Sequence, residues 1–207
     1  PVLIENPSLT SKDLKAYNVV ILANGVPNLT EGTVTALKEW VAAGGVLIAT
    51  GKAGAWAGKQ GLISLKTKET LLEKSDSLSV YRPFADKAGA KAGKLIKGVI
   101  LNCHLDKTHP LAWGLDQDEI AVMKTNDIIF RKDRDPYVSP LYYTKKPLLS
   151  GFLSADNANL LREEPAIMVK PYRSGKVIVF ADDMNFRSYF FGTSKLFMNA
   201  LFYNKCM

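Results

Sequence analysis

The chain has 207 residues, of which 47% are apolar and 23% charged, and this composition excludes an intrinsically disordered protein. Its length suits one domain with a substantial core. No apolar run approaches the roughly 20 residues that cross a bilayer, and the start of the chain carries no signal-peptide pattern. Composition therefore predicts one globular domain without a membrane span.

Neither the net charge nor the two cysteines indicate a specific function. The net charge of +7 would allow an anionic partner. The lysine excess recurs at helical spacing at Lys87, Lys91, Lys94 and Lys97. Because no aromatic residue is interleaved with these lysines, they predict a solvated face and no nucleic-acid partner. Cys103 and Cys206 are too few for a disulfide framework and lack the spacing of metal ligands.

The first fifty residues alternate between strand and helix. The chain begins at Pro1 without a methionine and enters an apolar run at residues 2–4, so we expect a strand there and a fragment of a longer protein. Residues 18–23 and 46–49 are further apolar runs typical of buried strands. Between them, Thr30 is a candidate N-cap for a helix with apolar residues on one side, and Gly44-Gly45 ends it. Three such steps predict a parallel, doubly wound sheet.

The middle of the chain is less regular. After Gly51, repeated glycines indicate turns, and residues 67–74 predict a short helix. Residues 76–97 are polar and rich in lysine. We therefore expect a single domain over residues 1–207, with an insertion around residues 60–97.

Residues 98–150 predict strands of another kind. Residues 98–103 have strand character, and short runs follow at 120–124, 128–131 and 138–143. Asp135-Pro136 and Lys146-Pro147 break these runs, and proline is tolerated at sheet edges. We expect a short antiparallel extension of the sheet.

The last fifty residues return to regular elements. Ser154 is a candidate N-cap for a helix to Leu161, and residues 166–170 form another strand. A hairpin-like turn at residues 173–176 leads into the final strand, which ends at Phe180. The closing helix begins at Gly192 or Thr193 and turns Phe197, Ala200 and Leu201 toward the core.

Two acidic residues follow the final strand, where open α/β sheets bind ligands. Asp182 and Asp183 could act as acid and base, or bind a cation. Alternatively, Asp182 caps the following turn and Asp183 pairs with Arg187. Since no nucleophile or third carboxylate lies nearby in the sequence, the capping and ion-pair roles are favoured.

The turn after the third strand, residues 50–54, lies where some α/β hydrolases place a nucleophile on a strained elbow. Such an elbow needs Ser or Cys at its apex, and here Lys52 or Ala53 would occupy it. The turn also lacks the Gly-Lys-Ser/Thr ending of a phosphate loop. A structural glycine turn is favoured.

Both histidines, His104 and His109, flank Asp106 and could be imagined as a metal site. However, Pro110 and Gly114 indicate a turn, which does not easily direct two imidazoles and a carboxylate at one ion. The sequence also lacks His-Glu-x-x-His. We predict a structural His-Pro turn and no metal ligands.

Four blocks of the sequence, in order, resemble a known family. They are Leu-Lys-Glu-Trp-Val-Ala-Ala-Gly-Gly-Val-Leu-Ile at 37–48, Leu-Asp-Lys-Thr-His-Pro-Leu-Ala-Trp-Gly at 105–114 and Pro-Leu-Leu-Ser-Gly at 147–151. The fourth is the closing block, Val-Ile-Val-Phe-Ala-Asp-Asp-Met-Asn-Phe-Arg at 177–187 followed by Phe-Gly-Thr-Ser-Lys-Leu-Phe-Met-Asn-Ala-Leu-Phe at 191–202. Together they are similar to the C-terminal domain appended to bacterial zinc carboxypeptidases of the carboxypeptidase A type.

That resemblance implies an α/β fold with a doubly wound, mostly parallel sheet, flavodoxin-like and class I glutamine amidotransferase-like. Active members of that fold carry a Cys on the elbow and a His-x-Glu after the last strand. This chain has Lys52 and Ala53 at the first position and Asp182-Asp183 at the second. The resemblance therefore implies a domain without catalytic residues of its own.

The leading functional hypothesis is a non-catalytic accessory domain of a secreted or cell-envelope zinc metallocarboxypeptidase. It would support the catalytic domain of the same polypeptide or bind its peptide or cell-wall substrate. The zinc would belong to that catalytic domain, and we expect no cofactor in this chain.

Two alternatives come from the residues themselves. The first is a stand-alone amidotransferase-like hydrolase or lyase with an atypical site in the crevice at the strand ends. The candidate crevice residues are Asn24, Gly51, Lys52, Asp182, Asp183, Asn185 and Arg187. The second is a sugar- or peptidoglycan-binding module that uses exposed aromatic rings. The candidate rings are Trp56, Trp113, Tyr142 and Tyr143.

Overall fold

The computed structural model describes residues 2–4, 9–71, 81 and 83–207. Its strands are β1 (Val19–Leu22), β2 (Val46–Thr50), β3 (Val99–Leu105), β4 (Glu119–Lys124), β5 (Leu141–Ser150), β6 (Pro165–Tyr172) and β7 (Gly175–Phe180). Its helices are α1 (Ser11–Leu14), α2 (Glu31–Ala42), α3 (Lys52–Lys59), α4 (Lys87–Lys94), α5 (Ala155–Leu161) and α6 (Phe191–Phe202).

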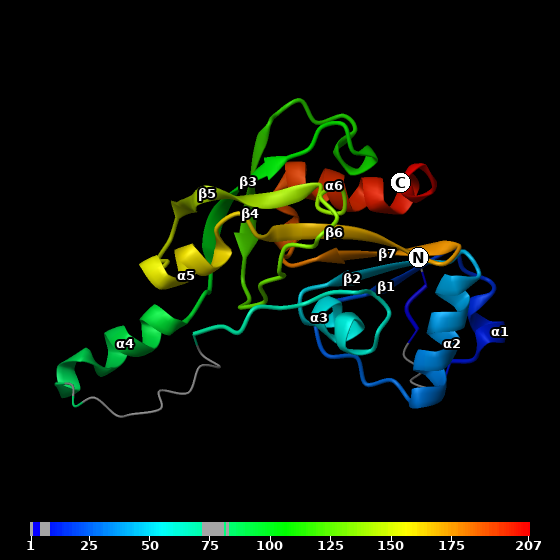
Figure 1. The fold of residues 1–207 in the computed structure, drawn as a ribbon, viewed down its shortest axis with the longest axis horizontal. Helices are drawn as coiled ribbons and strands as arrows, with labels where there is room; N and C mark the ends of the chain where they lie inside the picture. The colour runs from blue at the N-terminus through cyan, green and yellow to red at the C-terminus, as the bar shows by residue number, and fades with distance from the viewer. Residues whose placement is uncertain (1, 5–8, 72–80, 82) are drawn as a thin grey trace.

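The strands form one mixed sheet in the order β1-β2-β7-β6-β5-β3-β4 (Figure 1). Strands β1, β2 and β7 run parallel, whereas all pairs from β7 to β4 are antiparallel. The α/β class is confirmed, but the expectation of a mostly parallel sheet is wrong. The two-residue loop Arg173-Ser174 reverses the chain between β6 and β7, so the antiparallel part begins in the middle of the sheet.

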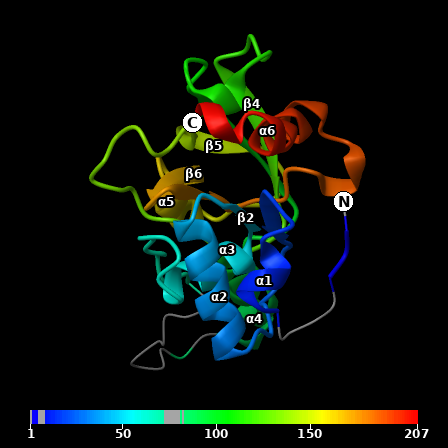
Figure 2. The same cartoon turned by 90° about the vertical axis from the view of Figure 1, so that its right-hand side faces the viewer.

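Helices cover both faces of the sheet. Figure 2 shows α1, α2 and α3 on one side and α6 on the other. Alternating residues of the central strands supply both cores: Leu47 and Val179 pack with Leu37 of α2, whereas Ile48 packs with Leu196 of α6. The expected one-sided pattern of α2 is present, and Thr30 caps its N-terminus through a bond from the Thr33 backbone N–H, as predicted. The central strands are thus held from both sides, which fixes their carboxyl ends.

Several local expectations fail in the middle of the chain. Residues 2–4 are not a strand, and Gly54 and Gly58 lie within helix α3 instead of marking turns, whereas Gly61 lies in a turn as expected. Residues 67–71 form no helix, because Thr67 makes a single bridge to Phe130; residues 72–74 of that expected helix lie outside the described residues. Residues 128–131 form only this bridge instead of a strand. Strand β5 continues through Pro147, which sits where the register with β3 shifts.

The later elements agree with the sequence pattern. Ser154 caps α5, and the final strand and closing helix lie where they were expected. Helix α4 extends away from the body of the molecule in Figure 1, and none of its residues is buried. Lys87, Lys91 and Lys97 of the predicted lysine face are exposed, while the insertion around residues 60–97 stays a prediction. None of the helices in the described ranges combines the length and apolarity that crossing a membrane requires.

Candidate functional site: the crevice at the ends of the parallel strands

The three parallel strands end at one edge of the sheet and surround a crevice of about 370 Å³. Asn24 follows β1, Gly51 follows β2, and Asp182 and Asp183 follow β7. In open α/β sheets this edge is the usual position of a ligand site. The crevice is lined by Ile21, Ala23, Asn24, Thr50, Gly51, Asn126, Asp182, Asp183, Met184, Asn185 and Phe197.

Gly51 forms the apex of the turn between β2 and α3. Its φ of 52° and ψ of −120° lie outside the conformations that residues with a Cβ adopt readily. The Gly51 backbone N–H donates to the Phe180 carbonyl at 2.7 Å, which ties the turn to the end of β7. The apex is therefore Gly51 rather than Lys52 or Ala53, which are the first two residues of the helix. The turn has the strained geometry of a nucleophile elbow and carries no side chain there.

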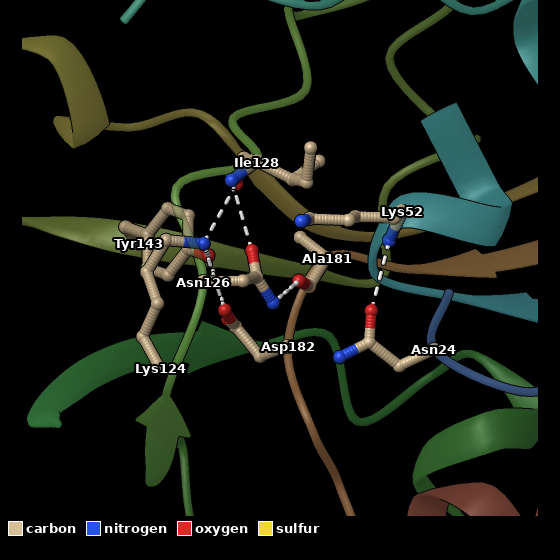
Figure 3. Close-up of polar contacts among 8 residues, drawn as sticks. All are labelled: Asn24, Lys52, Lys124, Asn126, Ile128, Tyr143, Ala181 and Asp182. Carbon is tan, nitrogen blue, oxygen red and sulfur yellow. Dashed lines mark hydrogen bonds and ion pairs between the residues drawn. The ribbon is translucent and has the colours of Figure 1, made fainter. Parts of the chain in front are cut away.

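The Asn24 side chain occupies the space beside that apex. Its Oδ1 accepts a hydrogen bond from the Lys52 backbone N–H at 3.1 Å (Figure 3). A Cβ atom on Gly51 would lie 2.8 Å from the Asn24 Cγ and closer still to Oδ1. A serine or cysteine at this position would therefore collide with Asn24. The arrangement has no place for an elbow nucleophile.

Asp182 lies in a buried polar network beneath the crevice. Its Oδ1 is 2.9 Å from the Lys124 Nζ, and its Oδ2 accepts a hydrogen bond of 2.6 Å from the Tyr143 hydroxyl (Figure 3). Both the Lys124 and the Asp182 side chains are completely buried. Lys124 also donates to the Ile128 carbonyl at 2.7 Å. The predicted turn-capping role of Asp182 is therefore wrong, because both of its oxygens bind side chains of β4 and β5.

Burial and the charge of Asp182 also raise the pKa of two neighbouring groups, Tyr143 and Cys103. Burial, followed by the nearby Asp182 carboxylate, raises the pKa of Tyr143 well above its ordinary value. Burial likewise raises the pKa of the Cys103 thiol on β3, and the Asp182 charge adds to the effect. Both groups therefore stay protonated at neutral pH. A buried neutral thiol is not a nucleophile, so Cys103 does not replace the missing elbow residue.

Asn126 joins this network to the crevice wall. Its Nδ2 donates to the Ala181 carbonyl at 2.9 Å, and its Oδ1 accepts from the Ile128 N–H at 2.9 Å. The loop after β4 is thereby held against the residue that precedes Asp182. Figure 3 shows Lys124, Asn126 and Asp182 converging from the β4 and β7 ends.

Asp183 has the turn-capping role that the sequence predicted for Asp182. The Asp183 Oδ1 accepts a hydrogen bond of 3.1 Å from the Asn185 backbone N–H and so caps the turn after β7. The guanidinium of Arg187 lies 5.4 Å from the centre of the Phe186 ring, and the described ion pairs include none between Asp183 and Arg187. The predicted Asp183–Arg187 pair is therefore wrong. Arg187 lies in the 3₁₀ turn Phe186–Ser188 with a φ of 50°, and its guanidinium contacts the Phe186 ring instead.

The structure brings five of the seven candidate residues to the crevice, namely Asn24, Gly51, Asp182, Asp183 and Asn185. Lys52 and Arg187 are not among the lining residues; Lys52 contributes only its backbone N–H to the Asn24 contact. The sequence reasoning missed Lys124, Asn126 and Tyr143. A signal was present for Lys124, because the two-residue period of β4 places it on the same buried face as Ile120 and Val122.

The other predicted groups lie elsewhere. His109 caps a short 3₁₀ turn by accepting the Leu111 N–H at its Nδ1, which confirms the His-Pro turn, and His104 lies within β3. Within the described ranges, no three His, Cys, Asp or Glu side chains are grouped as metal ligands. Of the four candidate rings, Tyr143 is buried and Trp56 packs against the core. Tyr142 contacts His104, and the exposed Trp113 packs edge-on against Tyr203.

No protein-family model and no curated protein matches this chain. The solved structures that resemble its fold include a ThuA-like protein, a GMP synthase-like protein and a β-galactosidase. A ThuA-like protein from Bacteroides uniformis has a TM-score of 0.54 at 13% identity, over 93% of this chain and 71% of that one. A GMP synthase-like protein from Thermoplasma acidophilum has a TM-score of 0.53 at 10% identity, over 93% and 75%.

The third is a β-galactosidase from Bacillus circulans sp. alkalophilus, with a TM-score of 0.51 at 14% identity. The match covers 94% of this chain but only 23% of the β-galactosidase. The chain has an α/β fold of the flavodoxin-like class. At these identities the likeness establishes the fold alone, and function has to be argued from the site.

Proposed function

We propose that this chain is a non-catalytic accessory domain of a longer protein, and that the longer protein is a zinc metallocarboxypeptidase. One observation carries the first part: Gly51 occupies the elbow apex, and the Asn24 side chain fills the space that a nucleophile would need. The four sequence blocks carry the second part. In this role the domain supports the catalytic domain or binds part of its substrate.

The burial and hydrogen bonding of the Asp182 carboxylate support the same proposal. A catalytic acid or base must reach substrate, directly or through one water. Asp182 is completely buried, and both carboxylate oxygens already bind Lys124 and Tyr143. Removing a carboxylate from water is favourable only when it is paired and hydrogen-bonded, and here both conditions hold. Asp182 thus stabilises the end of β7 rather than transferring protons.

The accessory role is tested with the complete polypeptide from which this chain derives. The proposal expects a zinc-binding His-x-x-Glu motif in the same reading frame and a peptidase activity that a chelator abolishes. Deleting residues 1–207 should lower the thermal midpoint of the peptidase or raise its KM, while its zinc content stays the same. A reading frame without that motif, or a deletion with neither effect, contradicts the proposal.

A further inference from the structure

The crevice retains hydrogen-bonding groups that no contact within the described residues uses. Asn24 engages its Oδ1 with Lys52 but leaves both N–H groups of Nδ2 without a partner. Asp183 engages Oδ1 with the Asn185 N–H and leaves Oδ2 available. The Thr50 hydroxyl is likewise available. Donors and acceptors therefore line the same small space.

Charge restricts what these groups can bind. None of the described lining residues is Lys, Arg or His, and the Lys52 N–H at the start of α3 is already bonded to Asn24. An anion such as phosphate would find no cation among these lining residues, and that helix N–H is already taken. A bound metal ion would find Asp183 as the one lining carboxylate with a free oxygen, because both oxygens of Asp182 are engaged. The crevice suits a neutral ligand that both donates and accepts hydrogen bonds.

The apolar residues that line the crevice narrow the class of ligand further. Ile21 is 44% exposed although it belongs to β1, and Met184 and Phe197 also line the crevice. A pyranose ring presents C–H groups on its faces and hydroxyl groups around its edge, which matches apolar walls beside free amide and carboxylate groups. The volume of about 370 Å³ is near the lower end of small-molecule pockets, which run from ~300 to 1,000 Å³.

We propose that the crevice between the ends of β1, β2 and β7 binds a neutral mono- or disaccharide. Asp183 Oδ2 accepts from ring hydroxyls, Asn24 Nδ2 donates to a hydroxyl oxygen, and Ile21 packs against the apolar face of the sugar. This inference rests on the proposed function, because a crevice without a nucleophile holds its ligand and releases it unchanged.

The test is a heteronuclear NMR titration of the purified chain with glucose, galactose, N-acetylglucosamine and lactose at millimolar concentrations, with glutamine as the non-sugar comparison. At least one sugar should shift the signals of the Asn24 side-chain amide and the Gly51 backbone N–H. Two near-isosteric variants isolate the contacts. Asn24→Asp keeps the acceptor for Lys52 and removes the donors, and Asp183→Asn keeps the turn cap and removes the charge.

Each variant should weaken binding at least about tenfold, as expected when a hydrogen bond to a charged or well-placed group is lost. Asp156→Asn, on the exposed side of α5, is the matched control and should bind like wild type. Well-dispersed spectra of both variants establish that they are folded. Absence of shifts with all four sugars overturns the inference, as does unchanged affinity in both variants or a response to glutamine alone.

The same samples are assayed for turnover of glutamine and of lactose. Turnover would contradict the proposed non-catalytic function, whatever the titration shows. Absence of both turnover and binding would overturn only the saccharide site and leave the accessory role intact.

Discussion

The Lys124 ammonium and the Asp182 carboxylate lie 2.9 Å apart, and neither side chain is accessible to solvent. They join residues 58 positions apart in the sequence, from β4 and from the turn after β7. Tyr143 completes the network from β5. This contact ties the antiparallel half of the sheet to the end of its parallel half, directly below the crevice.

Removing one partner of this pair should strongly destabilise the domain. We expect Lys124→Met to lower the free energy of unfolding by about 3–5 kcal/mol, because it leaves a carboxylate buried without its cation. Adding Asp182→Asn should recover part of that loss, since no net charge then remains buried. Urea denaturation of the single and double variants measures both effects.

The exposed pair Lys107–Asp118 provides the control. Lys107→Met should cost less than about 1 kcal/mol, as is usual for surface ion pairs. If Lys124→Met costs no more than Lys107→Met, the buried network does not hold the two halves of the sheet together.

Alkaline pH should reduce stability through Tyr143. Its pKa is raised above the ordinary value of 10.0, mainly by burial, so the folded state keeps this proton to a higher pH than the unfolded chain does. Above about pH 10 the folded state therefore binds more protons, and the free energy of unfolding falls as the pH rises. Below that pH the contribution is fully present.

Tyr143→Phe should flatten this fall and cost about 1–3 kcal/mol at neutral pH, because Asp182 loses a hydrogen bond. Urea midpoints between pH 8 and about pH 11 measure the slope, with the exposed Tyr137→Phe as a control. Cys103, whose pKa is also raised, contributes a slope that the Tyr143 variant retains. Parallel curves for wild type and Tyr143→Phe would contradict the assignment.

A side chain at the elbow apex should be poorly tolerated. Gly51→Ala places a Cβ against Asn24 at a positive φ, and we expect a loss of about 1–3 kcal/mol or more. Combining it with Asn24→Ala should recover the part due to the collision but not the part due to the backbone. Thermal denaturation of both single variants and the double variant gives the coupling energy.

Gly89→Ala in the exposed helix α4, where a Cβ would meet no atom, should be neutral or slightly stabilising. A Gly51→Ala variant as stable as Gly89→Ala would show that the apex accepts a side chain.

Local patterns in the sequence predicted much of this fold. The buried strands, the Thr30 and Ser154 caps and the closing helix all follow from short-range periodicity and capping, which act within a few residues. The hairpin turn predicted at residues 173–176 is also present, and it makes β6 and β7 antiparallel. The direction of the other strands did not follow from local signals, because the pairing of β5 with β3 joins distant segments of the chain.

The candidate site was predicted only in part, for the same reason. The general position of ligand sites in α/β sheets located Asn24, Gly51 and Asp183 correctly. The partners of Asp182 could not be read from its neighbours in the sequence, because they come from β4 and β5. Arg187 was the nearest cation in the sequence, whereas Lys124 is the cation that the fold brings into contact.

We propose that this chain binds a ligand or supports a catalytic domain and does not itself catalyse a reaction. The most direct measurement is ammonia release from glutamine by the purified chain, compared with a buffer blank and with Asp183→Asn. We predict a rate equal to the blank for both proteins, because Gly51 offers no nucleophile and Asp182 no free carboxylate. A rate above the blank that falls in Asp183→Asn would contradict this account.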